Sequence, residues 1–401
     1  MALIVQKFGG TSLRTPESRK AVLRHIIRAK RAGNDVVVVV SAMGKNGDPY
    51  ATDTLIGLLE PYSGEICLRN RDLLISCGEI ISASVMASYI QSNGFDAEAM
   101  TGFQAGIITD DDFGSAQILR IDTSPVMDRI KNGKIAVIAG FQGVTESGEI
   151  TTLGRGGSDI TALALGGYLK ADVVEIYTDV PGIAICDPHI IPEAPVLSHI
   201  SYSEVLALAE NGAKVLNPRA VKTAMEFKIP FRVRSTFGED TGTLVGHKHH
   251  DFPISGISVQ CNLAFVVFNR EVCFQLEELK FMSSKLGEFV DMPANKSKAL
   301  LIPEEKIPLA SRVAKSLNAQ VKIIKGLGKV CAVYNERDIA LNREGTIAQQ
   351  IEVILKDMKV PINTIKRFSN HFFAVIPQEF CPQAAKAVFD EFFIKNKRQA
   401  I

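Results

Sequence analysis

The sequence predicts an α/β protein whose N-terminal part is a three-layer αβα domain and whose C-terminal part is two smaller α+β modules. From residue 1 to about 245, apolar β-rich runs alternate with amphipathic stretches and glycine turns, as in a mainly parallel sheet covered by helices on both faces. From about residue 254 the order changes to strand, helix, strand, strand, helix, strand, and then largely repeats. A chain of 401 residues that is 46% hydrophobic is also too long for one ordinary core.

The clearest strands of the first part each end at small or polar residues, such as Gly9–Thr11, Ser41–Gly44 and Gly140–Gly143. In open α/β sheets, ligands bind beyond the carboxyl ends of the strands. We therefore expect these turns to meet at one site. The five strands are Leu3–Gln6, Val36–Val40, Ile135–Ala139, Val173–Tyr177 and Phe231–Val233.

The order of strands and helices in the C-terminal part predicts two split βαβ units, each a two-layer α+β arrangement. We expect strands at Leu263–Phe268, Ala299–Ile302, Val321–Ile324, Val330–Tyr334, Ile362–Lys366 and Phe372–Ile376. The expected helices are Leu276–Leu286, Leu309–Leu317, Thr346–Met358 and Pro382–Phe393. The predicted domains are 1–245, a linker at 246–253, and modules at 254–327 and 328–401. The linker holds three histidines, which we expect to be exposed and to bind no metal.

Composition excludes several classes of partner and location. Forty-five basic side chains against forty-four acidic ones give no long-range field that attracts nucleic acid or an anionic membrane. The seven cysteines have no pair at metal-ligand spacing, so we expect reduced thiols. Only the short apolar run Ala2–Val5 precedes Lys7, which predicts no signal peptide. No stretch approaches the roughly 20 apolar residues of a membrane helix, so the expected location is the cytoplasm.

The first candidate site is Lys7–Ser12, where a lysine at a strand end is followed by two glycines and two hydroxyls. Glycines let backbone N–H groups approach phosphate oxygens, and a following helix directs its positive end at them. Lys7 would then neutralise charge on a transferring phosphoryl group. In a P-loop the lysine follows the glycines, so this is not a P-loop. Taken alone, a strand followed by two glycines is more often an ordinary tight turn than a phosphate site.

The second candidate is Gly154–Asp159, with three glycines around one arginine before an Ala/Leu-rich helix. In a purely structural interpretation, Ser158 caps the helix and Asp159 answers its dipole. That leaves Arg155 without a role, whereas a guanidinium in a glycine loop is well shaped to hold a carboxylate with two parallel hydrogen bonds. We favour the binding role.

Two weaker candidates follow. Thr178–Gly182 comes directly after a strand and precedes Asp187-Pro188, but an Asp followed by Pro-Gly is also an ordinary turn. Gly212–Val215 offers Lys214 after a small-residue turn, where a lone lysine is usually solvated.

Taken together and in this order, the four motifs resemble the aspartate kinase family, a branch of the amino-acid kinase superfamily. The resemblance implies transfer of the γ-phosphoryl group of ATP to the side-chain carboxylate of L-aspartate, with Mg²⁺ bound to the nucleotide and no protein ligands assigned to the metal. It implies that Lys7 and Asp159 are catalytic. The implied nucleotide residues are Lys7, Phe8, Gly9, Gly10, Thr178, Asp179, Lys214 and Val215, and the implied aspartate residues are Ser41, Thr52, Glu79, Arg155, Ser158 and Asp159.

Two positions depart from the family pattern. After Thr178-Asp179 the family carries a tyrosine and then Asp-Pro-Arg, whereas this chain has Ala184 and Asp187-Pro188-His189. Loss of an aromatic contact and a permanent cation would weaken ATP binding or alter its pH dependence. One alternative is therefore a catalytically weak or inactive amino-acid-sensing paralogue.

A second alternative is a kinase for another acidic amino acid, such as an N-acetylated glutamate. Glu79 and Asp159 suit a free ammonium and argue against an acylated substrate. The C-terminal part resembles the tandem ACT modules of aspartate kinases. This implies a homo-oligomer paired through these modules and an amino-acid effector such as lysine, threonine or diaminopimelate.

Overall fold

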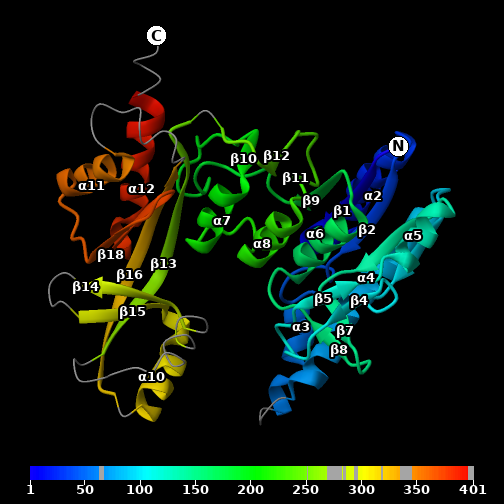
Figure 1. Ribbon diagram of the computed structural model, residues 1–401, viewed down its shortest axis with the longest axis horizontal. Helices are drawn as coiled ribbons and strands as arrows, with labels where there is room; N and C mark the ends of the chain where they lie inside the picture. The colour runs from blue at the N-terminus through cyan, green and yellow to red at the C-terminus, as the bar shows by residue number, and fades with distance from the viewer. Residues whose placement is uncertain are drawn as a thin grey trace. The chain divides into compact units, whose positions relative to one another are not determined.

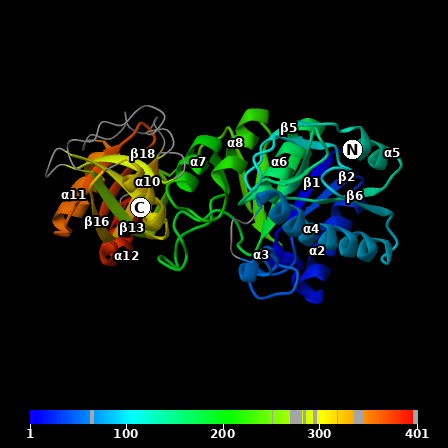
Figure 2. The same ribbon diagram turned by 90° about the horizontal axis from the view of Figure 1, so that it is seen from below.

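The computed structural model describes residues 1–62, 67–250, 252–268, 282, 286–292, 297–317, 319–334 and 346–395. It divides into two compact units (Figures 1 and 2). The first unit comprises Met1–Ile183, Val196–Leu206 and Val215–His250, and the second comprises Ala184–Pro195, Ala207–Lys214 and Asp251–Ile401. Two short segments that the sequence-based domains put with the N-terminal part thus belong to the second unit.

The first unit is built on an eight-stranded sheet in the order β10-β12-β11-β9-β1-β2-β6-β3. Every neighbouring pair is parallel except β11 and β12, which are antiparallel, so the predicted mainly parallel sheet is confirmed. The strands are β1 Leu3–Phe8, β2 Asp35–Val40, β3 Ala97–Met100, β6 Ile135–Ala139, β9 Val173–Thr178, β10 His199–Ser201, β11 Phe231–Ser235 and β12 Thr243–Gly246.

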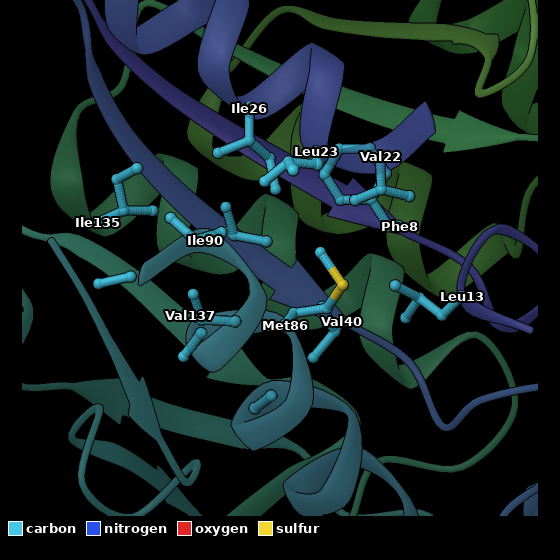
Figure 3. Close-up of a cluster of buried hydrophobic side chains, with 14 of the residues drawn as sticks. Phe8, Leu13, Val22, Leu23, Ile26, Val40, Met86, Ile90, Ile135 and Val137 are labelled. Atoms are coloured by element: carbon cyan, nitrogen blue, oxygen red, sulfur yellow. The ribbon is translucent and has the colours of Figure 1, made fainter. Parts of the chain in front are cut away.

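Helices cover both faces of this sheet because its central strands are apolar on both sides. Val36, Val38 and Val40 of β2 pack with α2 and α4 in one buried cluster (Figure 3). On the other face, Val39 lies against Gly140 and Ser158 at the start of α6. The helices of this unit are α1 Gly10–Leu13, α2 Pro16–Arg31, α3 Thr52–Gly57, α4 Leu68–Gln91, α5 Ser124–Lys131, α6 Gly157–Leu169, α8 Pro218–Phe227 and the first half of α7 Tyr202–Glu210.

Met86 on α4 is fully buried in the cluster of Figure 3. We expect Met86→Ala to lower the free energy of unfolding by about 2 to 5 kcal/mol, because it removes apolar contacts and leaves a cavity. Urea unfolding of the two-unit chain measures this. Val85 on the same helix is 38% exposed, so Val85→Ala is the matched control, and an equal loss in both variants would contradict the assignment of Met86 to the core.

A second sheet of four short strands, in the order β5-β4-β7-β8, was not predicted. Its strands are β4 Ile107–Thr109, β5 Ile118–Ile121, β7 Gln142–Thr145 and β8 Ile150–Thr152. Buried hydroxyls tie two of them together, since Thr109 Oγ1 lies 2.6 Å from Thr151 Oγ1. This sheet carries Thr152 to the candidate site.

Of the helices that the structure describes, α4 is long and apolar enough to span a membrane by length and composition alone, and half of its most apolar window is buried in the protein. It also buries two carboxylates, Asp72 and Glu79. These features are those of a core helix.

The second unit contains a six-stranded antiparallel sheet in the order β14-β15-β13-β16-β18-β17. Its strands are β13 Ile254–Phe268, β14 Glu288–Met292, β15 Ser297–Pro303, β16 Val321–Tyr334, β17 Thr364–Arg367 and β18 His371–Pro377. Its helices are α10 Ile307–Ser316, α11 Ile347–Asp357 and α12 Cys381–Phe389, followed by a π-helical turn at Asp390–Lys395. The predicted helix Leu276–Leu286 lies almost wholly outside the described residues.

The predicted strands Val321–Ile324 and Val330–Tyr334 are one continuous strand, β16. The proposed module boundary between residues 327 and 328 therefore falls inside it. Gly326, with φ +73°, forms an irregularity within the strand instead of a turn. Gly328 is required there because a Cβ would meet Cys381 Sγ of α12.

Of the polar segment after β12, His247 and Lys248 are exposed as expected, whereas His249 is half-buried and His250 is buried. The side chain of His250 is 3% exposed, and its Nε2 lies 3.7 Å from Glu204 Oε1. His249 Nδ1 lies 3.2 Å from Glu204 Oε2, and that glutamate is 1% exposed. The backbone N of Ser201 donates to Glu204 Oε2 at 2.9 Å, and such hydrogen bonds are what a buried carboxylate requires.

Candidate active site

The turns after β1 and β2 meet at the carboxyl edge of the main sheet, as the sequence predicted. Ser41 N donates to Phe8 O at 3.1 Å, and Gly44 N donates to Gly10 O at 2.9 Å. A side chain at Gly10 would approach Gly44 O and Ala42 O to within 2.6 and 2.7 Å. Only glycine fits at this close approach of two backbones.

A pocket of about 400 Å³ opens beside these turns. It is lined by Lys7 and by all six residues that the resemblance assigned to aspartate: Ser41, Thr52, Glu79, Arg155, Ser158 and Asp159. They come from β1, the turn after β2, and helices α3, α4 and α6 with its preceding loop. The structure thus joins five separate stretches of sequence in one cavity.

Lys7 and Asp159 form an ion pair inside the pocket. Lys7 Nζ lies 2.6 Å from Asp159 Oδ1, and their side chains are 11% and 15% exposed. Lys7 is the second-last residue of β1, and Asp159 lies in the first turn of α6. The ammonium is held at a site where few waters screen it, which strengthens its action on a nearby anion.

The purely structural interpretation of the sequence made Ser158 the N-cap of α6. The structure contradicts this. The N-cap of α6 is Gly156, in the left-handed conformation with φ +73°. Ser158 is buried in the first turn and lines the pocket. A side chain on Gly156 would also meet the Asn217 side chain, so both backbone conformation and space require glycine here.

Glu79 is a buried carboxylate that faces the pocket from α4. Its Oε1 accepts a hydrogen bond from Ala42 N at 2.9 Å. Its Oε2 is buried and has no hydrogen-bond partner among the described residues. Burial raises the pKa of Glu79 to about 8, against the opposing effect of the Ala42 hydrogen bond. A buried oxygen without a partner is costly, so this atom is suited to a ligand that brings a positively charged donor.

Arg155 lies in a loop fixed through its backbone. Asn217 Nδ2 donates to Arg155 O at 2.9 Å, and Arg219 Nη1 donates to Leu153 O at 2.7 Å. Arg155 itself is exposed at the pocket. The loop is therefore held while the guanidinium is available to an anion.

The implied nucleotide residues have different surroundings. Phe8 is buried and stacks on Tyr177, with ring centroids 4.6 Å apart, so only its backbone is available at the site. Thr178 ends β9 beside β1, and Asp179 N donates to Thr178 Oγ1 at 2.6 Å. Neither Thr178 nor Asp179 lines the pocket described above.

The predicted pair Lys214 and Val215 falls at a point where the chain passes from the second unit to the first. Within the second unit, Lys214 and His189 both lower the pKa of Asp187. Burial raises the pKa of Asp187. Hydrogen bonds from the His189 backbone and ring and the charge of Lys214 outweigh that effect, so the pKa lies below its usual value. His189 Nδ1 lies 2.9 Å from Asp187 Oδ1. Val215 is 37% exposed.

Sequence reasoning missed several residues of the pocket, including Lys45, Asp53, Arg71 and Phe141. Phe141 has φ +69°, a conformation that costs energy for a bulky residue and occurs at functional sites. No sequence signal marks it. Arg71 had one, since Arg71, Ile75 and Glu79 are spaced by four along α4 and such residues share a helix face.

The chain matches the amino acid kinase family over residues 2–235. It is 35% identical to an aspartokinase of Geobacillus stearothermophilus over 414 residues, and the match covers 100% of both chains. The chain belongs to the aspartokinase family. This confirms the resemblance drawn from the motifs and supports aspartate kinase function.

Other members of the aspartokinase family are also similar to this chain. Aspartokinase 1 of Bacillus subtilis is 49% identical over 249 residues, but the match spans only 62% of that relative and 62% of this chain. The crystal structure of E. coli aspartokinase III in complex with aspartate and ADP matches with a TM-score of 0.80 and 22% identity, over 98% of this chain and 100% of that one. The same enzyme with lysine and aspartate matches with a TM-score of 0.72. These structures show that the fold is shared.

Proposed function

We propose that this aspartokinase-family chain transfers the γ-phosphoryl group of ATP to the β-carboxylate of L-aspartate, giving 4-phospho-L-aspartate. The observation that carries the proposal is the single pocket in which Glu79, Arg155 and the Lys7–Asp159 pair meet. It offers acids for the substrate ammonium, a guanidinium for the α-carboxylate, and the Lys7 ammonium for the transferring phosphoryl group.

The charges of the pocket residues suggest how the acceptor, L-aspartate, is bound. The ammonium of aspartate suits the partnerless Oε2 of Glu79, with Asp159 as a second acid, and its α-carboxylate suits the fork of Arg155. Ser41, Thr52 and Ser158 add hydroxyls along the same wall. The β-carboxylate is left to attack. It is ionised at neutral pH, so the reaction needs no general base and depends on alignment.

On the nucleotide side, the backbone at Gly9 and Gly10 would hold phosphate oxygens, and Lys7 would stabilise the charge of the transferring group. Thr178, Asp179, Lys214 and Val215 are the further proposed nucleotide contacts. Asp159 would hold Lys7 in place through their 2.6 Å ion pair.

Mg²⁺ is the proposed companion of ATP. No group of three or more His, Cys, Asp or Glu suited to a metal occurs in the part of the chain that the structure describes. We expect phosphates and waters to supply most of the ligands of this ion. The ion would neutralise phosphate charge.

The cellular role that we propose is the first step in the synthesis of lysine, threonine, methionine and diaminopimelate, in the cytoplasm. The second unit would act as the ACT-like regulatory part, binding an amino-acid effector and pairing subunits into a homo-oligomer. Its antiparallel sheet with helices α10, α11 and α12 supports this proposal.

The test is a hydroxylamine trap, which converts the labile acyl phosphate to a stable hydroxamate. We expect product that depends on ATP, Mg²⁺ and L-aspartate together, and lower product when lysine, threonine or diaminopimelate is added as the effector. A folded protein that binds an amino acid and yields no hydroxamate would contradict the kinase and indicate a sensor. Ala184 and His189 would then be the first residues to revert to the family pattern.

Arg155→Gln should raise the KM for aspartate about 10- to 100-fold with a smaller change in kcat, because the lost interaction is a charge-assisted pair made on binding. Arg155→Lys is the matched comparison and should recover part of the loss, since lysine keeps the charge without the fork. Steady-state hydroxamate kinetics measure both. Unchanged aspartate saturation in the glutamine variant would remove Arg155 from the carboxylate site.

A further inference from the structure

Arg71 is a second arginine in the acceptor pocket. It lies on α4 two turns before Glu79 and lines the same cavity. Its Nη1 lies 3.2 Å from the position that a Cβ on Gly114 would take. The guanidinium therefore lies against the wall of the pocket that Gly114 forms.

The neighbouring residue fixes this placement. Asp72 is fully buried, and its Oδ2 accepts from Gly114 N at 2.8 Å and from Thr152 N at 2.7 Å. Its Oδ1 accepts from Thr152 Oγ1 at 2.8 Å. These three bonds lock the start of α4 to the two segments that form the wall, so the origin of the Arg71 side chain is held.

The same wall leads to Arg155. A Cβ on Gly154 would lie 3.0 Å from Gly114 O, so Gly114 packs directly against the residue that precedes Arg155. Arg71 and Arg155 thus flank one contact between two glycines. Lys7 is held elsewhere, beside Gly9 and against Asp159.

Arg71 is available to a ligand because the nearby acids Glu149 and Asp72 are engaged by other groups. Its neighbour on the helix, Arg69, is paired with Glu149 at 2.6 Å. Asp72 is committed to backbone and hydroxyl donors. Within residues 1–62 and 67–250 and the other described segments, no hydrogen bond or ion pair engages the Arg71 guanidinium.

We propose that Arg71 is a second binding residue for the α-carboxylate of the amino-acid substrate, acting beside Arg155. The inference rests on the proposed function and names a further specificity-determining residue of its acceptor site. Two guanidinium groups along one wall repel each other until an anion lies between them. They therefore favour a substrate with an ionised α-carboxylate over the corresponding α-amide, which brings no negative charge.

The experiment compares Arg71→Gln and Arg71→Lys with the wild-type chain, using L-aspartate and L-aspartate α-amide. The amide is measured as a substrate or as a competitive inhibitor. Arg71→Gln should raise the KM for aspartate about 10- to 100-fold, as for a lost charge-assisted hydrogen bond. The KM for ATP and the affinity for the α-amide should stay within about threefold, and Arg71→Lys should fall between. Arg69→Gln, two residues away on the same helix, is the matched control.

Two results would overturn the inference. An unchanged KM for aspartate in Arg71→Gln would remove Arg71 from substrate binding. Equal losses for aspartate and its α-amide, or a raised KM for ATP, would assign it a structural or phosphate-binding role instead. Wild-type activity is the separate test of the proposed function, because a wild-type chain that forms no hydroxamate fails that proposal before any variant is compared.

Discussion

Lys7→Ala is expected to lower kcat about 10³-fold, as removal of a group aimed at transition-state charge does in comparable sites. The ammonium lies in a largely buried pair with Asp159 and beside the turn at Gly9. Its interaction with the transferring phosphoryl group grows as charge builds up in the transition state. The KM for aspartate should change much less, since the proposed site assigns the α-carboxylate to Arg155 and the ammonium to Glu79 and Asp159.

Hydroxamate formation at saturating ATP and aspartate measures this effect. Lys20→Ala removes an exposed lysine from α2 and should leave kcat within twofold, while thermal unfolding of both variants checks that the first unit stays folded. An unchanged kcat for Lys7→Ala would show that the lysine is only a structural partner of Asp159.

Glu79→Gln is expected to lower kcat/KM for aspartate about 100-fold or more, because it replaces a buried charge pair with the substrate ammonium by a neutral contact. The pH profile gives a second readout. With the pKa of the free carboxyl raised to about 8 by burial, the wild-type kcat/KM should rise with pH up to about 8 and then level off. The glutamine variant has no such group and should lose that rise.

The stability of the fold should fall as pH rises, opposite to the expected rise in kcat/KM. The pKa of Glu79 is raised by folding from 4.5 to about 8, so the folded state binds this proton more tightly than the unfolded state. The resulting stabilisation is complete below pH 4.5 and is lost as pH rises through about 8, because stability falls with pH wherever the folded state holds more protons. Glu79→Gln should therefore melt higher than wild type at pH 8.5 or so. Glu226→Gln, on the exposed face of α8, should show no pH-dependent difference in melting temperature from wild type. A wild-type kcat/KM that does not rise toward pH 8 would refute the assignment of Glu79 as a buried acid.

The site was predictable from the sequence where it depends on local pattern. Buried valine and isoleucine runs identify the strands, and the glycine and hydroxyl residues after them mark the carboxyl edge where parallel strands place a site. This is why Lys7, Ser41 and Arg155 lie in one pocket. Glu79 was found only through the resemblance, since nothing in a helix sequence shows which carboxylate will be buried.

The sequence could not predict features that depend on long-range contacts. The four-stranded sheet escaped notice because strands such as Ile107–Thr109 are too short for a clear alternation. The module boundary predicted between residues 327 and 328 lies within β16. The role of Asp72 depends on donors from Gly114 and Thr152, 42 and 80 residues away.

The membership of Ala184–Pro195 and Ala207–Lys214 in the second unit limits how the parts of aspartokinases can be recombined. Ile257 N donates to Ile185 O at 2.6 Å, and the Asn211 backbone and side chain accept from Ser258 Oγ and Lys329 Nζ at 2.8 and 3.1 Å. A chimera joined near residue 245 would pair these two segments with a foreign sheet. A working exchange of the second unit between relatives must carry both segments, and with them Lys214, so this proposed nucleotide contact is inherited together with the second unit.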